Sequence, residues 1–171
     1  MKLFLIGLSG VGKTSFGDKL AKLLGLKFID LDNYIENKSN DSIEEIFQTS
    51  GESVFRGLEN DALKELIKLD NVLISCGGGT PCFNNNLELM KSSGTIIHLT
   101  IPNRVIAQRL MNSHKRPLLD SESKHDLLLK LEGQWAERKQ FYQQADIEVD
   151  VFSWNAEKMN LLKQQIENYI K

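Results

Sequence analysis

The octapeptide GLSGVGKT, residues 7–14, fits the pattern G-x-x-x-x-G-K-[ST]. It lies between an apolar run, Leu3 to Ile6, that predicts a strand and a stretch of helical period, Lys13 to Leu24, that predicts a helix. Glycines let the backbone curl so that successive N–H groups point at phosphate oxygens, and the N-terminus of the helix adds a positive dipole. The alternative is a glycine-rich turn with an exposed lysine. The strand-to-helix context favours a loop that binds the phosphates of ATP or GTP.

Each polar side chain of this loop has an expected task. The ammonium group of Lys13 reaches the β and γ phosphates, and the Thr14 hydroxyl is a ligand for Mg²⁺. The expected nucleotide-binding residues of the loop are Gly10, Val11, Gly12, Lys13, Thr14 and Ser15. The loop by itself does not identify the group that accepts the phosphoryl.

Composition limits the class of protein. The chain has 171 residues, of which 41% are hydrophobic and 26% charged, and we expect one globular domain over residues 1–171. No apolar run is long enough to span a membrane, and LFLIGL is too short for a signal peptide, so we expect a cytoplasmic protein without a membrane partner. The formal net charge of -2 argues against nucleic-acid binding. A monomer is the expected assembly, because no exposed apolar stripe is evident.

The cysteines and histidines give no sign of a metal site. Cys76 and Cys82 lack a second pair at zinc-site spacing, so we interpret both as structural thiols. His98, His114 and His125 lie in unrelated contexts and are assigned no function.

Short apolar runs alternate with longer stretches of helical period, which predicts an α/β fold. The runs are continuous, as expected when both faces of a parallel sheet are covered. We therefore predict a doubly wound, five-stranded parallel sheet with helices on both faces. The predicted strands are Leu3 to Ile6, Lys27 to Asp30, Val72 to Ser75, Thr95 to Leu99 and Ile147 to Val151.

Helices are predicted between these strands. Ser42 and Glu45 form a capping-box pattern that opens a short helix, and a longer one follows from about Ser53 to Leu69. Further helices should run from Pro102 in a first turn to Leu110, and from a cap at Asn155 to Ile170. Residues 111–124 are polar and basic with little periodicity, and they predict a surface loop between two helices.

The segment FIDLD, residues 28–32, ends a buried-looking run in two carboxylates. Residues two apart on a strand point to the same side, so Asp30 and Asp32 can face one cavity at the carboxyl edge of the sheet, where ligands of open α/β sheets bind. Two like charges there would raise one pKa unless a cation such as Mg²⁺ lies beside them. The alternative is a solvated turn in which Asp32 caps the next helix.

Two further patterns indicate an acceptor site. Arg56 and Glu59 are three apart on one helix face, so the carboxylate can orient the guanidinium, which can in turn hold a substrate carboxylate by two hydrogen bonds. The alternative is a surface ion pair of small energetic value. Residues 77–79 are three glycines that follow a predicted strand, and they leave room for a ligand against the backbone; the alternative is a flexible turn.

Taken together, these motifs resemble the shikimate kinase family, within the nucleoside monophosphate kinase-like P-loop proteins. The resemblance covers nearly the whole chain in the order of the family. It rests on GLSGVGKT, FIDLD, FRGLE, CGGG, RPLL at 116–119 and Arg138-x-x-x-Tyr142. By this likeness the fold is that of a P-loop kinase with a substrate-binding segment at about residues 31–60 and a lid at about 111–124.

The resemblance also implies an activity and a set of roles. Such enzymes transfer the γ-phosphoryl of ATP to the 3-hydroxyl of shikimate, on the route to chorismate and the aromatic amino acids. The implied catalytic residues are Lys13, Asp32 and Arg116; the implied substrate-binding residues are Asp32, Arg56, Gly77, Gly78, Gly79 and Arg138; the implied metal-binding residues are Thr14 and Asp30. Arg109 is expected along the adenine, and Arg116 beside the transferring phosphoryl.

Two places depart from the family pattern, and two rival functions remain. Thr80-Pro81 stands where small aliphatic residues are expected, and the segment around Trp154-Asn155 matches no pattern for the adenine side. One rival is a kinase for another polyol acid such as gluconate, against which the FIDLD, FRGLE and CGGG set argues. The other is a nucleotide-binding regulatory module without catalysis, which would have no use for an acceptor site.

Overall fold

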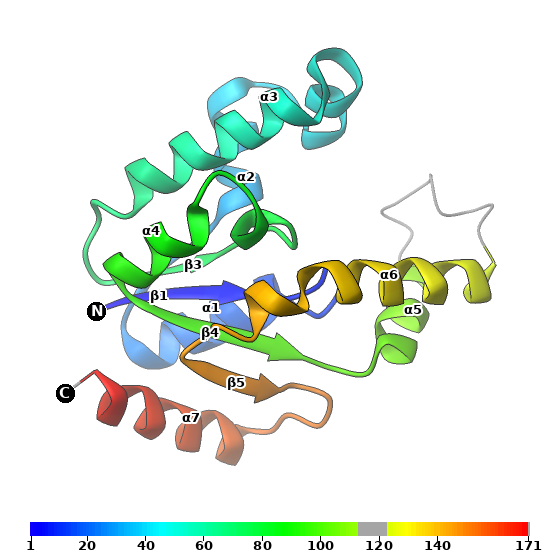
Figure 1. Cartoon of the computed structure of the whole chain (residues 1–171). Coiled ribbons are helices and arrows are strands. Elements are labelled where there is room, and N and C mark those ends of the chain that lie inside the picture. The colour runs from blue at the N-terminus through cyan, green and yellow to red at the C-terminus, as the bar shows by residue number, and fades with distance from the viewer. Residues whose placement is uncertain (113–122, 171) are drawn as a thin grey trace.

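The computed structural model describes residues 1–112 and 123–170, and these form a parallel sheet covered by helices on both faces (Figure 1). The sheet has five strands in the order β2-β3-β1-β4-β5 within this described part. The strands are β1 (Lys2–Ile6), β2 (Lys27–Asp30), β3 (Val72–Ser75), β4 (Thr95–Thr100) and β5 (Ile147–Asp150). The helices are α1 (Lys13–Leu24), α2 (Leu31–Ser39), α3 (Ile43–Leu66), α4 (Asn86–Ser93), α5 (Asn103–Met111), α6 (Lys124–Tyr142) and α7 (Ala156–Tyr169), with a short 3₁₀ helix η1 (Thr80–Cys82). The predicted fold class is confirmed.

Burial differs between the centre and the edges of the sheet. Strands β1, β3 and β4 are buried almost throughout, as their continuous apolar sequences predict. The expectation of uniform burial is wrong for the two edge strands. Strand β5 alternates between buried and exposed residues, and β2 is at most half-buried, because each has a neighbouring strand on one side only.

Helix ends agree with the capping signals in the sequence. The α1 helix has the predicted bounds and is capped at its C-terminus by Gly25, whose φ of 67° is the left-handed conformation that glycine favours. The predicted cap of α7 is confirmed, because Asn155 Oδ1 accepts a hydrogen bond from the Lys158 N–H at 2.9 Å. Pro102 lies one position earlier than expected, at the N-cap of α5 rather than in its first turn.

The α3 helix combines two predicted helices into one. The capping box of Ser42 and Glu45 opens it as expected, and both reciprocal hydrogen bonds are present. The predicted boundary near residue 52 is marked by Gly51, whose φ of 80° and ψ of 170° break the helical path. The helix ends at Leu66 instead of Leu69. It therefore consists of two helical parts that meet at a kink, and the second part carries the FRGLE motif.

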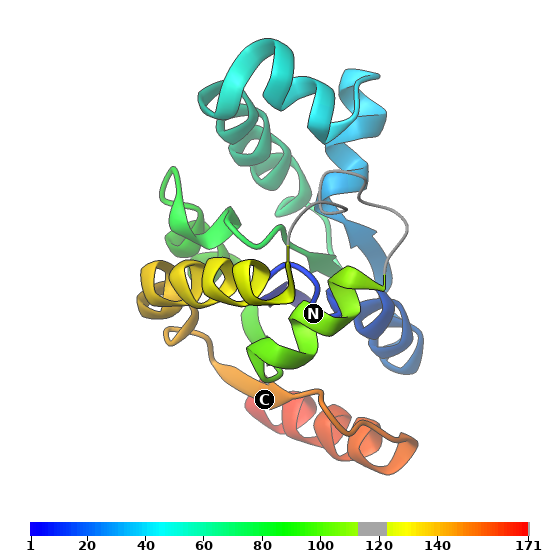
Figure 2. The same cartoon turned by 90° about the vertical axis from the view of Figure 1, so that its right-hand side faces the viewer.

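The helices bring the functional segments to one edge. Helices α1 and α7 lie on one face of the sheet, and α3, α4 and α6 lie on the other (Figure 1). Figure 2 looks toward the carboxyl ends of the strands, and α5 and α6, which contact each other, stand in front of this edge.

Among the described residues, no helix is both long and apolar enough to cross a bilayer. The bounds of helices α2, α4 and α6 were not predicted from the sequence.

Candidate active site

The phosphate loop joins β1 to α1 and depends on its glycines. Gly7, Gly10 and Gly12 have φ values of 142°, 87° and 105°, which L side chains rarely adopt. Gly7 and Gly10 also have no room for a side chain. A Cβ added at Gly7 would lie 2.6 Å from the Leu99 carbonyl oxygen, and one at Gly10 would lie 2.9 Å from a methyl of Ile106. The loop is therefore shaped both by its own backbone and by the elements that pack against it.

The loop opens into a cavity of about 330 Å³ at the carboxyl edge of the sheet. Loop residues form one wall, and the ends of β2 and β3 form the other. The lining residues are Ser9, Gly10, Gly12, Lys13, Thr14, Ser15, Asp30, Asp32, Ser75, Cys76, Gly77 and Gly78. The structure thus brings predicted phosphate-binding and metal-binding residues into one space with Asp32, Gly77 and Gly78 of the predicted acceptor site. The other predicted acceptor-binding residues, Gly79, Arg56 and Arg138, are not among the lining residues. Val11, also predicted to bind nucleotide, points its side chain to a different cavity.

Lys13 stays close to the phosphate loop. Its Nζ donates hydrogen bonds to the carbonyl oxygens of Gly7 and Leu8 at 2.9 and 3.0 Å. This arrangement holds the ammonium group over the curled backbone, beside the cavity. A positive charge so placed favours polyphosphate binding there.

The two carboxylates of FIDLD both line the cavity, although by a different geometry from the one predicted. Asp30 ends β2, whereas Asp32 lies in the first turn of α2 and not on the strand. The α2 helix is capped by Asp30, which accepts a hydrogen bond from Asn33 N–H at 3.4 Å, so the alternative in which Asp32 is the cap is wrong. The Thr14 hydroxyl donates to Asp30 Oδ2 at 2.8 Å. Thr14 and Asp30 are therefore adjacent, as a shared metal ligand set requires.

Asp32 has an unusual protonation equilibrium. Burial, together with the nearby carboxylates of Asp30 and Glu59, raises the pKa of Asp32 to about 6, and Lys13 opposes the shift. A carboxylate with such a pKa is a better proton acceptor near neutral pH than an ordinary aspartate. The sequence-based expectation that two close carboxylates would raise one pKa agrees with this shift.

Each glycine of residues 77–79 faces a different candidate substrate-binding group. A Cβ added at Gly77 would lie 3.1 Å from Asp32 Oδ1, one at Gly78 would lie 3.3 Å from Arg138 Nη1, and one at Gly79 would lie 2.7 Å from Arg56 Nη2. These spacings leave little or no room for side chains. The glycine triplet is therefore a close-packed floor under these groups, which argues against the alternative of a merely flexible turn.

Arg56 is held in place rather than solvated. Its Nη1 donates to Glu59 Oε2 at 2.9 Å, and its Nη2 and Nε donate to Glu52 Oε1 at 3.0 and 3.2 Å. The Arg56 side chain is 13% exposed and that of Glu59 is 0% exposed, so this pair differs from a surface ion pair. The Phe83 ring lies 4.1 Å from the guanidinium carbon. The predicted orientation of Arg56 by Glu59 is confirmed.

The second arginine, Arg138, lies on α6 close to the glycine triplet. One turn further along the helix, the Tyr142 hydroxyl donates to the Gly78 carbonyl oxygen at 2.5 Å. Burial raises the pKa of Tyr142 to about 12, although the Arg138 guanidinium beside it acts in the opposite direction. The motif Arg138-x-x-x-Tyr142 therefore ties α6 to the floor of the site.

Two predicted arginines concern the nucleotide side. Arg109 on α5 lies over the phosphate loop, and its Nη1 donates to the Val11 carbonyl oxygen at 3.1 Å. Arg116 and most of the predicted lid, residues 111–124, lie outside the described residues.

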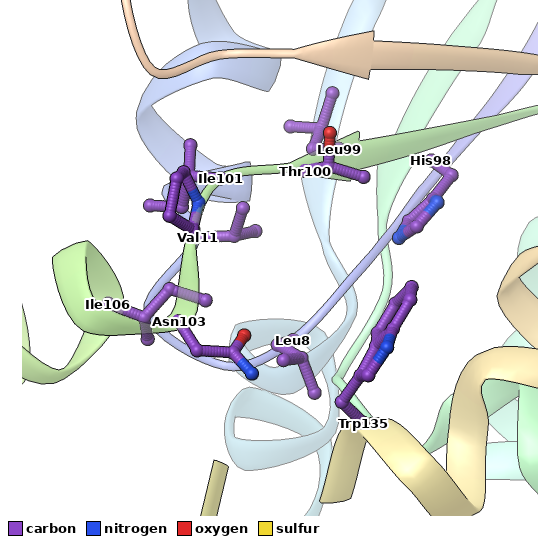
Figure 3. Close-up of a pocket in the computed structure, with 10 residues that line it drawn as sticks. Leu8, Val11, His98, Leu99, Thr100, Ile101, Asn103, Ile106 and Trp135 are labelled. Carbon is purple, nitrogen blue, oxygen red and sulfur yellow. The ribbon is translucent and has the colours of Figure 1, made fainter. Parts of the chain in front are cut away.

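A second cavity, of about 260 Å³, lies beside the phosphate loop. Figure 3 shows Val11 and Ile106 on one side, the stacked rings of His98 and Trp135 on the other, and Leu8 between Asn103 and Trp135. The two ring centres are 5.9 Å apart. Burial lowers the pKa of His98, against the opposing effect of Glu148. This cavity holds the apolar side chains of the loop and, apart from Val11, contains no predicted site residue.

Sequence reasoning missed Thr80 as part of the site. Its hydroxyl donates to Glu59 Oε1 at 2.6 Å, and the residue is fully buried. The available signal was the departure from the family pattern at Thr80-Pro81, which marks a polar residue where an apolar one was expected. Of the two cysteines, Cys76 is buried beside Met90, as expected of a structural thiol, and Cys82 is half-buried.

The fold and this site define a class. A five-stranded parallel sheet in the order β2-β3-β1-β4-β5, with a glycine-rich phosphate loop after its central strand and a carboxylate facing that loop, is the architecture of a P-loop kinase. The two guanidinium groups beside the glycine floor add a site suited to an anionic acceptor.

Comparisons with known proteins specify the family. The family model for shikimate kinase matches residues 9–168. The curated shikimate kinase of Parabacteroides distasonis is 42% identical over 92% of this chain and 89% of its own length. The chain therefore belongs to the shikimate kinase family, and it is an enzyme that phosphorylates shikimate with ATP.

Solved structures agree with this assignment. The crystal structure of shikimate kinase from Bacteroides thetaiotaomicron superposes with a TM-score of 0.90 at 32% identity, covering 99% of this chain and 98% of that one. The shikimate kinase of Acinetobacter baumannii, solved in complex with shikimate, gives a TM-score of 0.87 at 31% identity over 99% of this chain and 95% of that chain.

Proposed function

We propose that the cavity at the carboxyl edge of the sheet transfers the γ-phosphoryl of ATP to the 3-hydroxyl of shikimate, giving shikimate 3-phosphate and ADP. The observation that carries this proposal is the packing of the glycine triplet, in which Gly77, Gly78 and Gly79 each lie against Asp32, Arg138 and Arg56 respectively. A floor without side chains, between a proton acceptor and two guanidinium groups, suits a ring that bears hydroxyls on one side and a carboxylate on the other. The solved complex of the Acinetobacter baumannii enzyme with shikimate supports the choice of ligand.

Asp32 is the proposed proton acceptor. As the 3-hydroxyl oxygen forms its bond to the γ-phosphorus, the bond from that phosphorus to the ADP oxygen breaks, and the hydroxyl proton passes to the Asp32 carboxylate. The raised pKa of Asp32, about 6, brings its basicity closer to that task. Phosphoryl transfer depends mainly on position and charge, so holding the hydroxyl in line contributes at least as much as basicity.

Arg56 and Arg138 are the proposed binding groups for the substrate carboxylate. Both lie close to the glycine floor and come from different helices, α3 and α6: an added Cβ would be 2.7 Å from Arg56 Nη2 at Gly79 and 3.3 Å from Arg138 Nη1 at Gly78. Arg56 is already fixed by Glu59, so little of its freedom is lost when the substrate binds. The backbone of residues 77–79 would contact the ring itself.

The phosphates of ATP would be bound by the loop backbone and by the Lys13 ammonium. The proposed nucleotide-binding set is Gly10, Val11, Gly12, Lys13, Thr14, Ser15, Arg109 and Arg116. The roles of Arg109 along the adenine and of Arg116 in a lid at 111–124 rest on the family resemblance alone. We also propose a substrate-binding segment at about residues 31–60 within one domain, a monomeric state and a cytoplasmic location, where two free thiols are expected to persist.

Thr14 and Asp30 fit the requirements of a magnesium site. Their oxygens are 2.8 Å apart at the mouth of the phosphate loop, and hydroxyl and carboxylate oxygens are the donors that Mg²⁺ prefers. The described residues contain no cluster of three or more acidic, histidine or cysteine side chains that could hold a metal. This agrees with a Mg²⁺ ion bound largely through nucleotide phosphates and water, where it would neutralise phosphate charge.

Two variants test the proposed division of labour. Asp32→Asn should lower kcat by about 10²-fold or more while ATP affinity, measured by titration calorimetry, stays unchanged. Arg56→Ala should raise the KM for shikimate by the equivalent of about 2 to 4 kcal/mol and leave the KM for ATP nearly constant. Loss of nucleotide binding in Asp32→Asn would assign that carboxylate to the metal. Equal effects of Arg56→Ala on the KM values for both substrates would argue against the proposed carboxylate-binding site.

A panel of acceptors tests the choice of substrate. When shikimate, gluconate and quinate are each added with ATP and Mg²⁺, only shikimate should stimulate ADP release.

A further inference from the structure

We propose that Thr80 is a positioning residue of this enzyme: through Glu59 it fixes the guanidinium of Arg56, and so sets the affinity for the carboxylate of the acceptor. The inference rests on the proposed role of Arg56 in binding that carboxylate. It concerns a residue at which this chain departs from the family pattern, and it assigns the departure a function.

The two oxygens of Glu59 are divided between two partners. Oε2 accepts from Arg56 Nη1 at 2.9 Å, and Oε1 accepts from the Thr80 hydroxyl at 2.6 Å. Glu59 is fully buried. A buried carboxylate oxygen that loses its donor has no water to replace it, so the remaining partners rearrange or the group rotates. The Thr80 hydroxyl therefore fixes the plane of the carboxylate that orients Arg56.

Thr80 is itself held firmly. It begins the 3₁₀ helix η1 directly after the glycine floor, and its carbonyl oxygen accepts from Asn86 Nδ2 at 3.0 Å. Asn86 is buried, and its Oδ1 accepts from Asn60 Nδ2 at 2.7 Å. Asn60 lies one residue after Glu59 on α3. The network is therefore closed, joining α3, η1 and α4, and Thr80 cannot shift without breaking a second buried hydrogen bond.

The other contacts of Arg56 do not define its position by themselves. The Glu52 side chain, on the same helix, is 56% exposed, so water competes for its hydrogen bonds to Arg56. The Phe83 ring centre lies 4.1 Å from the guanidinium carbon, a contact that does not fix the rotation of the guanidinium. The guanidinium packs closely against Gly79, because a Cβ added at that glycine would be only 2.7 Å from Arg56 Nη2. A small rotation of Glu59 therefore changes the clearance between Arg56 and the glycine floor, where the substrate carboxylate would be bound.

The test is steady-state kinetics of Thr80→Val, which removes the hydroxyl and keeps the volume. We expect the KM for shikimate to rise roughly tenfold, with the KM for ATP changed less than about twofold. Thr80→Ser, which restores the hydroxyl, should recover most of the affinity. Thr95→Val is the matched control, because Thr95 is also buried but lies at the amino end of β4, away from the cavity. Thermal unfolding of all variants monitors folding; if Thr80→Val does not fold, Thr80→Ser against Thr80→Ala supplies the same comparison.

Dependence on the substrate carboxylate separates positioning from general damage. With the methyl ester of shikimate in place of shikimate, Thr80→Val and the unaltered enzyme should differ little in KM. An equal rise in KM for acid and ester, or no rescue by Thr80→Ser, would overturn the proposal.

The variant Arg56→Lys distinguishes a wrong role of Thr80 from a wrong role of Arg56. If Arg56→Lys also leaves the KM for shikimate unchanged, the proposed role of Arg56 is wrong. If Arg56→Lys raises that KM but Thr80→Val does not, only the role of Thr80 is wrong.

Discussion

The phosphate loop and the glycine floor of the proposed acceptor site lie on two sides of one cavity, yet the two are built in opposite ways. The loop is eight consecutive residues whose backbone forms the binding surface, with three glycines at positive φ. The acceptor side is formed by side chains from α2, α3 and α6, which meet over the glycine triplet. The loop is therefore specified locally, whereas the acceptor side exists only when distant elements are packed together.

This difference separates what is general from what is specific. Any nucleoside triphosphate offers phosphates to a ring of N–H groups, so the loop gives affinity without selecting the acceptor. In the proposed site, selection of the acceptor would depend on a few charged side chains that lie beside buried partners such as Glu59 and Tyr142. Substitutions on the two sides should therefore affect different kinetic constants.

The largest effect is expected on the nucleotide side. Lys13→Met removes the charge expected to contact the β and γ phosphates, and it should lower kcat by about 10³-fold with little change in the KM for shikimate. Rapid-quench or coupled ADP assays measure this. Lys19→Met, on the same helix, is the control and should retain full activity. A rise in the KM for shikimate as large as the fall in kcat would break the distinction between the two sides.

An intermediate effect concerns stability and pH on the acceptor side. The pKa of Asp32 is raised from its ordinary value of 3.8 to about 6, so the folded protein binds this proton more tightly than the unfolded chain does. That contribution to stability is fully present below about pH 4 and is lost as the pH rises through about 6. Asp32→Asn, which needs no proton to be neutral, should raise the free energy of unfolding by about 1 to 3 kcal/mol at pH 8.

The measurement is urea unfolding at pH 5 and pH 8 in the presence of EDTA, so that no metal interacts with the carboxylate. The gain in stability from Asp32→Asn should shrink at pH 5, because Asp32 of the unaltered protein is then largely protonated. Asp70→Asn, at an exposed carboxyl, is the control and should change stability little. A gain that is equal at both pH values would contradict the raised pKa.

The smallest effect is expected at Tyr142. Tyr142→Phe removes the hydrogen bond to the Gly78 carbonyl and should weaken shikimate binding by about 0.5 to 1.5 kcal/mol, with kcat and the KM for ATP nearly unchanged. Isothermal titration with shikimate measures the difference. Tyr34→Phe, which removes a hydrogen bond to Glu65 between α2 and α3, is the matched control. If both variants weaken shikimate binding equally, the floor is not specifically held by Tyr142.

The same difference explains which features could be predicted from the sequence. The strands, the bounds of α1, the caps at Ser42 and Asn155 and the phosphate loop follow from local patterns, and the structure agrees with them. The position of Arg56 beside Glu59 followed from helical spacing. The meeting of Arg56, Arg138 and Asp32 over the glycines was expected only from the family resemblance, because these residues are far apart in the sequence.

Other features required the structure because they depend on tertiary packing. Helix α2 has few apolar residues, and α4 is short, so neither has a strong periodic signal. Asp32 was expected to continue the extended geometry beyond the strand that ends at Asp30, but it lies in the first turn of α2, because Asp30 acts as the cap that starts this helix. The hydrogen bond from Thr80 to Glu59 joins residues 21 positions apart, and no local pattern predicts such a pair.

The packing of Gly7 has a consequence for the order of events during synthesis of the chain. Position 7 requires glycine because a Cβ there would lie 2.6 Å from the carbonyl oxygen of Leu99, near the end of β4. Strand β1, which leads into the loop, has β3 and β4 as its neighbours. The phosphate loop leaves the ribosome before β3 and β4 do, but its surroundings are complete only after residue 100 has followed. ATP binding by ribosome-bound fragments of increasing length should therefore begin only once β4 has emerged, so the nucleotide reports a late stage of folding.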